Sequence, residues 1–223
     1  MIGDTVDLSR VNWRCVHRLH RVLTEWMRGE KPPVVIAIAG ESGSGKTTLA
    51  VALEKTFREF GMGVRVLQQD DYYRLPPKTN DRRRREDISW VGPGEVNLQL
   101  LDDHLAAIRK GATRIEKPLV IYDEDRIVRE VLPLNGVQII LVEGTYVSLL
   151  QQVHWRVFIN RDYRDTRADR LQRGRDARDA FMEQVLAIEH RILRQHQRWA
   201  DILITRDFRV RVRRRQHSTR EQA

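Results

Sequence analysis

The stretch Val-Val-Ile-Ala-Ile-Ala-Gly-Glu-Ser-Gly-Ser-Gly-Lys-Thr-Thr, residues 34–48, decides the fold that we expect for this chain. Its first six residues are apolar, which is typical of a strand buried on both faces. A loop with the spacing G-x-x-x-x-G-K-[ST] follows, and helix-forming residues come directly after it. The fixed positions of this loop are Gly40, Gly45, Lys46 and Thr47. Strand, loop and helix in this order predict a site for a nucleoside triphosphate.

The expected loop suits phosphate chemically. Glycine permits the turn and the close approach of backbone N–H groups to phosphate, and the helix N-terminus adds a positive dipole end. Lys46 would reach the β- and γ-phosphates, and Thr47 would hold Mg²⁺. We expect the nucleotide to be bound by Gly40, Glu41, Ser42, Gly43, Ser44, Gly45, Lys46, Thr47 and Thr48. The alternative is a glycine-rich turn without a ligand, which the flanking strand and helix disfavour.

The composition is that of a globular protein with a preference for anionic partners. The chain has 223 residues, 41% of them hydrophobic, and a formal net charge of +9. That length accommodates one domain with a sizeable core, and the charge favours nucleotides, phosphorylated substrates or nucleic acid. The single cysteine, Cys15, excludes an intramolecular disulfide and fits a reducing compartment. No apolar run approaches 18 residues and no signal-peptide pattern is present, so we expect a cytoplasmic protein without a membrane span.

Apolar runs of strand type alternate with helical patterns along the sequence. This alternation predicts a three-layer αβα sandwich with a mainly parallel sheet, and a site at the carboxyl ends of its strands. We expect an N-terminal amphipathic helix within residues 1–31 that packs on the core, followed by the P-loop domain over 32–206. A helical lid is expected at about 164–180 and a basic C-terminal tail at 207–223.

Two basic segments have no assigned role at this point. Residues 74–87 are rich in proline, arginine and aspartate and include the run Arg82-Arg83-Arg84-Arg85, so we expect a mobile, solvated surface loop. The arginine-rich tail is expected to fray or to lie on the surface. Contact of either segment with substrate or nucleic acid is the alternative.

Two carboxylates stand at the ends of expected strands. Asp70 follows the strand at residues 64–67, and Glu143 follows the apolar run at 137–142. Phosphoryl transfer needs a carboxylate near the acceptor hydroxyl, a metal holder and positive charge over the transferred group. The guanine-reading segment Asn-Lys-x-Asp of GTPases is absent, and the second acidic strand does not end in Asp-Glu as it usually does in motor-type ATPases.

Taken in order, these motifs resemble the uridine kinase and phosphoribulokinase family of small-molecule kinases. The resemblance spans about residues 33–207. The matching segments are Gln69-Asp70-Asp71-Tyr72-Tyr73, Val142-Glu143-Gly144, Asp165-Thr166-Arg167, Arg173-Gly174-Arg175-Asp176 and Ala200-Asp201-Ile202-Leu203-Ile204. The phosphate loop alone is specific for nucleotide binding, whereas the ordered set is what indicates the kinase family.

The resemblance implies roles for several of these residues. Asp70 would be the catalytic base and would lie near Mg²⁺, Glu143 would be a second carboxylate at the metal beside Thr47, and Tyr73 would line the acceptor pocket. Two or more of the lid arginines would close over the triphosphate, the candidates being Arg170, Arg173 and Arg175. The alternative is a solvated basic helix. We therefore expect an ATP- and Mg²⁺-dependent kinase that phosphorylates an alcohol group of a small acceptor.

The sequence departs from uridine kinases where the nucleoside would be recognised. Ile127 stands where those kinases carry a base-reading histidine, and an aliphatic side chain makes no hydrogen bond. Tyr122 and Asp123 are retained as candidate acceptor-binding residues, and Trp90 either stacks on a ring or packs. A nucleoside or a sugar therefore stays open as the acceptor, and the sequence does not indicate an oligomeric state.

Two other functions are compatible with the phosphate loop. One is a nucleic-acid-binding P-loop ATPase that uses the arginine-rich segments, although no aromatic stacking motif accompanies them. The other is a nucleotide-binding regulatory protein without kinase activity. Nucleic-acid binding at low salt would support the first, and turnover with any acceptor would exclude the second.

Overall fold

The computed structural model describes residues 6–9, 11–167 and 180–213 and is built around one six-stranded sheet. The strand order is β2-β5-β1-β6-β7-β8, and every pair except β7–β8 is parallel. The strands are β1 Val34–Gly40, β2 Val64–Gln68, β5 Ile139–Gly144, β6 Trp155–Ile159, β7 Ile202–Ile204 and β8 Val210–Val212. The expected α/β fold with a mainly parallel sheet is confirmed.

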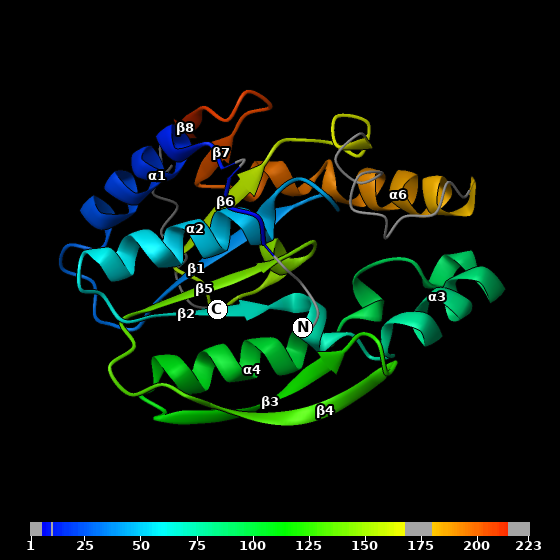
Figure 1. Ribbon diagram of the computed structural model, residues 1–223, viewed down its shortest axis with the longest axis horizontal. Coiled ribbons are helices and arrows are strands. Elements are labelled where there is room, and N and C mark those ends of the chain that lie inside the picture. The colour runs from blue at the N-terminus through cyan, green and yellow to red at the C-terminus, as the bar shows by residue number, and fades with distance from the viewer. Residues whose placement is uncertain (1–5, 10, 168–179, 214–223) are drawn as a thin grey trace, which may run out of the picture.

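The central strand β1 is apolar throughout because both of its faces are covered. Val34, Ile36 and Ile38 pack with α1 Trp13–Trp26 and α2 Lys46–Glu59. Val35, Ala37 and Ala39 face the opposite layer. That layer contains α4 Leu98–Arg109 and the hairpin formed by β3 Arg114–Ile121 and β4 Arg126–Pro133. Figure 1 shows the two layers on either side of the sheet.

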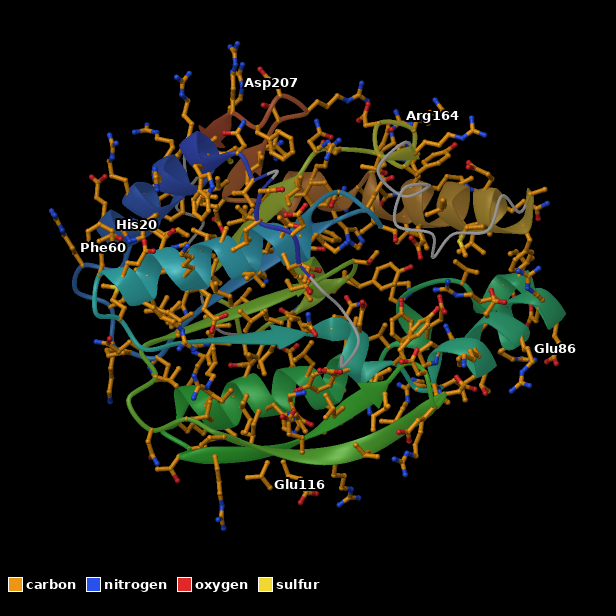
Figure 2. All side chains as sticks on the ribbon, in the orientation of Figure 1. His20, Phe60, Glu86, Glu116, Arg164 and Asp207 are labelled. Atoms are coloured by element: carbon orange, nitrogen blue, oxygen red, sulfur yellow. The ribbon has the colours of Figure 1, made fainter. Side chains whose placement is uncertain are left out.

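Two further helices lie at the carboxyl ends of the parallel strands. Figure 1 shows α3 Pro77–Glu86 and α6 Ala180–Leu193 at this end of the molecule. The short 3₁₀ helices are η1 Gln69–Tyr72, η2 Ile88–Trp90, η3 Pro93–Glu95, η4 Val147–Leu149 and η5 His196–Trp199. In Figure 2, Glu86 and Arg164 mark this end, whereas the stacked rings of His20 and Phe60 mark the opposite one.

The structure corrects the expectation of a surface loop at residues 74–87, because most of this segment is helix α3. Pro77 occupies the first turn, where a missing N–H costs nothing, and pairs four residues apart such as Arg85–Asp81 support the exposed face. The arginine run is also not uniformly solvated, since the side chain of Arg84 is only 13% exposed and pairs with Glu95. Residues 77–86 therefore form a helix although they are almost all polar, and the side chain of Arg84 is largely covered.

The expected tail begins with ordered structure. Val210–Val212 forms β8, which pairs antiparallel with β7 and covers the edge of the sheet. The backbone groups at the edge of β7, which would otherwise be unpaired, hydrogen-bond to this strand. Within the described residues, no helix is long and apolar enough to cross a membrane.

Candidate active site

The phosphate loop connects β1 to α2 and has the backbone geometry that its glycines predict. Gly45 has φ +99°, a left-handed conformation that favours glycine. At Gly40 a Cβ atom would lie 2.7 Å from Ser44 Oγ and 3.1 Å from the carbonyl oxygen of Ile159, so a side chain there would force its neighbours to shift. Because α2 begins at Lys46, its free N–H groups lie at the loop, as an anion site requires.

Lys46, Thr47 and Glu143 lie together at the end of this loop. The hydroxyl of Thr47 donates to Glu143 Oε1 at 3.0 Å, and Lys46 Nζ donates to the carbonyl oxygen of Glu41 at 2.9 Å. Glu143 is buried at the end of β5, the strand beside β1. A hydroxyl and a carboxylate at hydrogen-bond distance are oxygen ligands of the kind that Mg²⁺ takes alongside phosphate oxygens. These two residues therefore fit a magnesium ion.

Both carboxylate oxygens of Glu41 have hydrogen-bond partners within the protein. Its Oε2 accepts from the backbone N–H of Tyr163 at 2.8 Å, and its Oε1 lies 2.7 Å from Nδ1 of His190 in α6. Burial raises the pKa of the Glu41 carboxyl, and the hydrogen bond from His190 opposes that rise. Any contact of Glu41 with nucleotide therefore falls to its backbone, and its side chain joins the loop to α6.

Two adjacent aspartates after β2 have different surroundings. Asp70 is exposed at the carboxyl edge of the sheet in η1. Asp71 is buried, and it accepts from Lys117 Nζ at 2.8 Å and from the Val120 N–H at 3.0 Å. Lys117 also contacts Glu130 at 3.1 Å. Asp71 thus holds the β3–β4 hairpin in place. Asp70 is exposed after β2, the strand that pairs with β5, which carries Glu143.

A group of buried and partly buried polar side chains, which we call the Arg84 cluster, lies close to α3 and α6. Its members come from α3, α6 and the segments after β2, η2 and β5: Tyr73, Arg84, Glu95, Tyr146 and Glu189. Arg84 donates to both carboxylate oxygens of Glu95, at 2.5 and 3.1 Å, and lies 3.6 Å from Glu189. Sequence reasoning identified only Tyr73 of these five, because the others lie in no local pattern.

Charges within the cluster shift the titration of its members. Burial raises the pKa of the Glu189 carboxyl to about 7; the charge of Arg84 lowers it, and Glu95 raises it further. Burial likewise raises the pKa of Tyr73 well above its ordinary value, with Arg84 opposing and Asp70 reinforcing the shift. Arg84 stays charged, since its carboxylate partners outweigh the effect of its burial on its pKa. The cluster therefore holds one firm ion pair and one carboxyl that is readily protonated.

Asn80 and Trp90 hold the Arg84 cluster from outside. Asn80 donates to Glu95 Oε2 at 2.6 Å, and the indole N–H of Trp90 donates to Asn80 Oδ1 at 2.9 Å. The backbone N–H of Gly92 donates to the other Glu95 oxygen at 2.8 Å. Trp90 therefore packs in the protein, and Glu95 is fully engaged by α3 and the segment after it.

The tip of the β3–β4 hairpin lies against the start of α3. Asp125 accepts from the backbone N–H groups of Lys78 and Thr79 at 2.6 and 3.3 Å, which caps the helix from 46 residues away. The predicted acceptor residues Tyr122 and Asp123 lie in this same turn. Lys78 Nζ donates to the carbonyl oxygen of Asp123 at 2.8 Å. The structure thus brings the hairpin tip to α3, the helix that carries Arg84.

The predicted lid arginines Arg170, Arg173 and Arg175 lie outside the described residues. Two arginines from the segment before them are described. Arg167 lies 3.7 Å from Glu183 of α6, and Arg164 is exposed at the carboxyl end of the sheet (Figure 2).

The chain is similar in sequence to small-molecule kinases. The sequence profile of the Phosphoribulokinase / Uridine kinase family matches residues 35–206. A bifunctional alpha-galactosidase/sucrose kinase of Mediterraneibacter gnavus is 30% identical over 85% of this chain, which spans only 22% of that relative. A uridine kinase of Clostridium novyi is 28% identical over 77% of this chain and 86% of its own length. A solved structure described as a candidate fructose transport system kinase, from Silicibacter sp. TM1040, has a TM-score of 0.66 at 17% identity, over 81% of this chain and 94% of its own.

Proposed function

The chain belongs to the phosphoribulokinase/uridine kinase family of P-loop kinases, and we propose that it transfers the γ-phosphoryl group of ATP to an alcohol group of a small acceptor. The observation that carries this proposal is the contact of Thr47 with Glu143 beside Lys46, with the exposed Asp70 after the neighbouring β2. These residues supply a metal holder, a phosphate-binding cation and a carboxylate for the acceptor.

In the proposed reaction, Lys46 and the N–H groups at the start of α2 hold the β- and γ-phosphates. Thr47 and Glu143 hold Mg²⁺, with Asp70 near it, and the ion would neutralise charge on the phosphate oxygens when bound. Asp70 accepts the proton of the acceptor hydroxyl. The oxygen of that hydroxyl forms a bond to the γ-phosphorus while the bond between the γ-phosphorus and the oxygen of the leaving ADP breaks. The lid arginines Arg170, Arg173 and Arg175 are proposed to stabilise the charge that develops on the transferred group.

The acceptor is proposed to be nucleoside- or sugar-like. The relatives differ in their acceptors by name, one being a sucrose kinase and another a uridine kinase. In this chain, Ile127 cannot hydrogen-bond a base. Loss of a polar reader changes discrimination by orders of magnitude, so recognition of a pyrimidine nucleoside would need another residue.

An acceptor screen tests the proposal. ADP release from ATP and Mg²⁺ would be followed with nucleosides, neutral sugars and sugar phosphates, and at least one acceptor should raise it well above the acceptor-free rate. Lys46→Ala should abolish that stimulation, since it removes the cation at the β- and γ-phosphates. If the purified full chain binds ATP but no acceptor stimulates release, the kinase proposal is wrong and a regulatory nucleotide-binding role takes its place.

A further inference from the structure

Two polar groups of the Arg84 cluster are not used within the protein. Tyr146 is fully buried, and its hydroxyl makes no hydrogen bond with any described residue; the same holds for Oε2 of the buried Glu189. Leaving a buried polar group unpaired costs stability. Native proteins keep such groups where a ligand or an ordered water completes them. These two atoms are therefore candidates for contact with a ligand.

The unused groups lie within electrostatic range of the proposed chemistry. The charge of Lys46, which faces the phosphates, lowers the pKa of Glu189, and the charge of Asp70 raises that of Tyr73. Glu189 and Tyr73 also influence the titration of Tyr146. Contacts of the neighbouring groups agree with this placement. The backbone N–H of Tyr146 donates to Oε1 of Gln69, the residue before Asp70, at 2.6 Å. Glu189 precedes His190, whose Nδ1 lies 2.7 Å from Glu41 of the phosphate loop. An acceptor whose hydroxyl reaches Asp70 would place its remaining atoms in this neighbourhood.

On the basis of the proposed kinase function, we propose that Tyr146 and Glu189 bind hydroxyl groups of the acceptor, and that the acceptor is an uncharged sugar. A sugar hydroxyl can donate to Glu189 Oε2, and another can accept from or donate to the Tyr146 hydroxyl. Both contacts are made at buried atoms, where a hydrogen bond discriminates most strongly.

The charges of the cluster disfavour an anionic acceptor. The one cation of the cluster, Arg84, already donates twice to Glu95 and faces Glu189 at 3.6 Å. Because Arg84 is already paired with the Glu95 carboxylate, the cluster has no unpaired cation for a phosphate or carboxylate group, whether Glu189 is protonated or not. A sugar phosphate would therefore be held here less well than the sugar from which it derives.

The acceptor class is tested by pairing each sugar with its phosphate ester. Neutral mono- and disaccharides, the matching sugar monophosphates and nucleosides would be compared by kcat/KM with the full chain. We expect neutral sugars to exceed their phosphate esters by at least about tenfold, the loss that one unmade polar contact produces. Preferred turnover of a sugar phosphate or nucleoside would overturn this inference and leave the kinase proposal standing. Absence of turnover with every class would overturn both.

The two residues are tested by Tyr146→Phe and Glu189→Gln. Each should raise KM for the neutral sugar by about tenfold or more while KM for ATP changes less than about twofold. Tyr146→Phe should also leave Tm unchanged or raise it, because it removes an unpaired buried hydroxyl. The matched control Tyr72→Phe removes a hydroxyl that is bonded to His104 at 2.9 Å; it should lower Tm and leave KM for the sugar unchanged. A purely structural role predicts that Tyr146→Phe behaves like this control, and that result would refute the assignment.

Discussion

Replacing Glu189 by glutamine should change how the stability of the protein depends on pH. Burial raises the pKa of this carboxyl from its ordinary value of 4.5 to about 7; Glu95 and Glu41 reinforce the rise, whereas Arg84 and Lys46 oppose it. Between these two values the folded protein holds a proton that the unfolded chain releases. The contribution of Glu189 to the free energy of unfolding is therefore most favourable below pH 4.5 and is lost as pH rises to about 7.

The magnitude follows from the difference between the two pKa values. At 1.36 kcal/mol for each pKa unit, a rise from 4.5 to about 7 corresponds to about 3 kcal/mol. Other groups that titrate in this range include His196, whose burial lowers its pKa to about 4, and they affect wild type and variant alike. The difference between the two proteins therefore isolates Glu189. Relative to Glu189→Gln, the wild type should become less stable by about 3 kcal/mol between pH 4.5 and pH 8.

Urea unfolding at pH 4.5, 6, 7 and 8 measures this difference, provided that both proteins unfold in two states with equal m-values. Glu86→Gln is the matched control, because the side chain of Glu86 is 69% exposed at the end of α3. That substitution should give a difference that does not vary with pH beyond about 0.5 kcal/mol. If the Glu189→Gln difference is equally flat, the carboxyl ionises normally in the folded protein and the argument from burial is refuted.

Three further substitutions separate the roles of neighbouring groups. Asp71→Asn should lower the free energy of unfolding by about 3 kcal/mol in urea titrations, because it leaves Lys117 without its closest carboxylate; a loss below about 1 kcal/mol would contradict this. Asp70→Asn should leave that free energy nearly unchanged and lower kcat by about 10²–10⁴, so a wild-type rate would exclude it as the base. Thr47→Val, which removes the hydroxyl bonded to Glu143, should raise the Mg²⁺ concentration for half-maximal turnover about tenfold or more. An unchanged Mg²⁺ requirement would remove Thr47 from the metal site.

The sheet and the phosphate loop could be predicted because their signals are local. The apolar run of β1, the glycines at 40 and 45 and the start of α2 lie within one stretch, and each has a direct physical reason. The apolar runs before Asp70 and Glu143 likewise predicted that both carboxylates stand at strand ends. The resemblance assigned the base role to Asp70, and the structure adds that Asp71 is bonded to Lys117.

Helix α3 was missed because what stabilises it is not local. Residues 74–87 have almost no apolar side chains, so the periodicity that reveals an amphipathic helix is absent. The cap comes from Asp125, 47 residues away from Lys78, and Arg84 pairs with Glu95 in another segment. Strand β8 was missed for a related reason, because three residues that pair at a sheet edge resemble a tail until the partner strand is known.

The two halves of the site differ in how the chain builds them, and this difference explains where the sequence becomes uninformative. The donor half is one contiguous loop whose geometry leaves little freedom: at Gly40 any side chain would meet Ser44 and Ile159. The Arg84 cluster takes its residues from five separate segments, each of which packs for its own reasons. If Tyr146 and Glu189 bind the acceptor as proposed, we expect a substitution at either residue to alter the acceptor preference more than ATP binding. The loop therefore predicts a bound nucleotide, and the cluster must be examined to infer the acceptor.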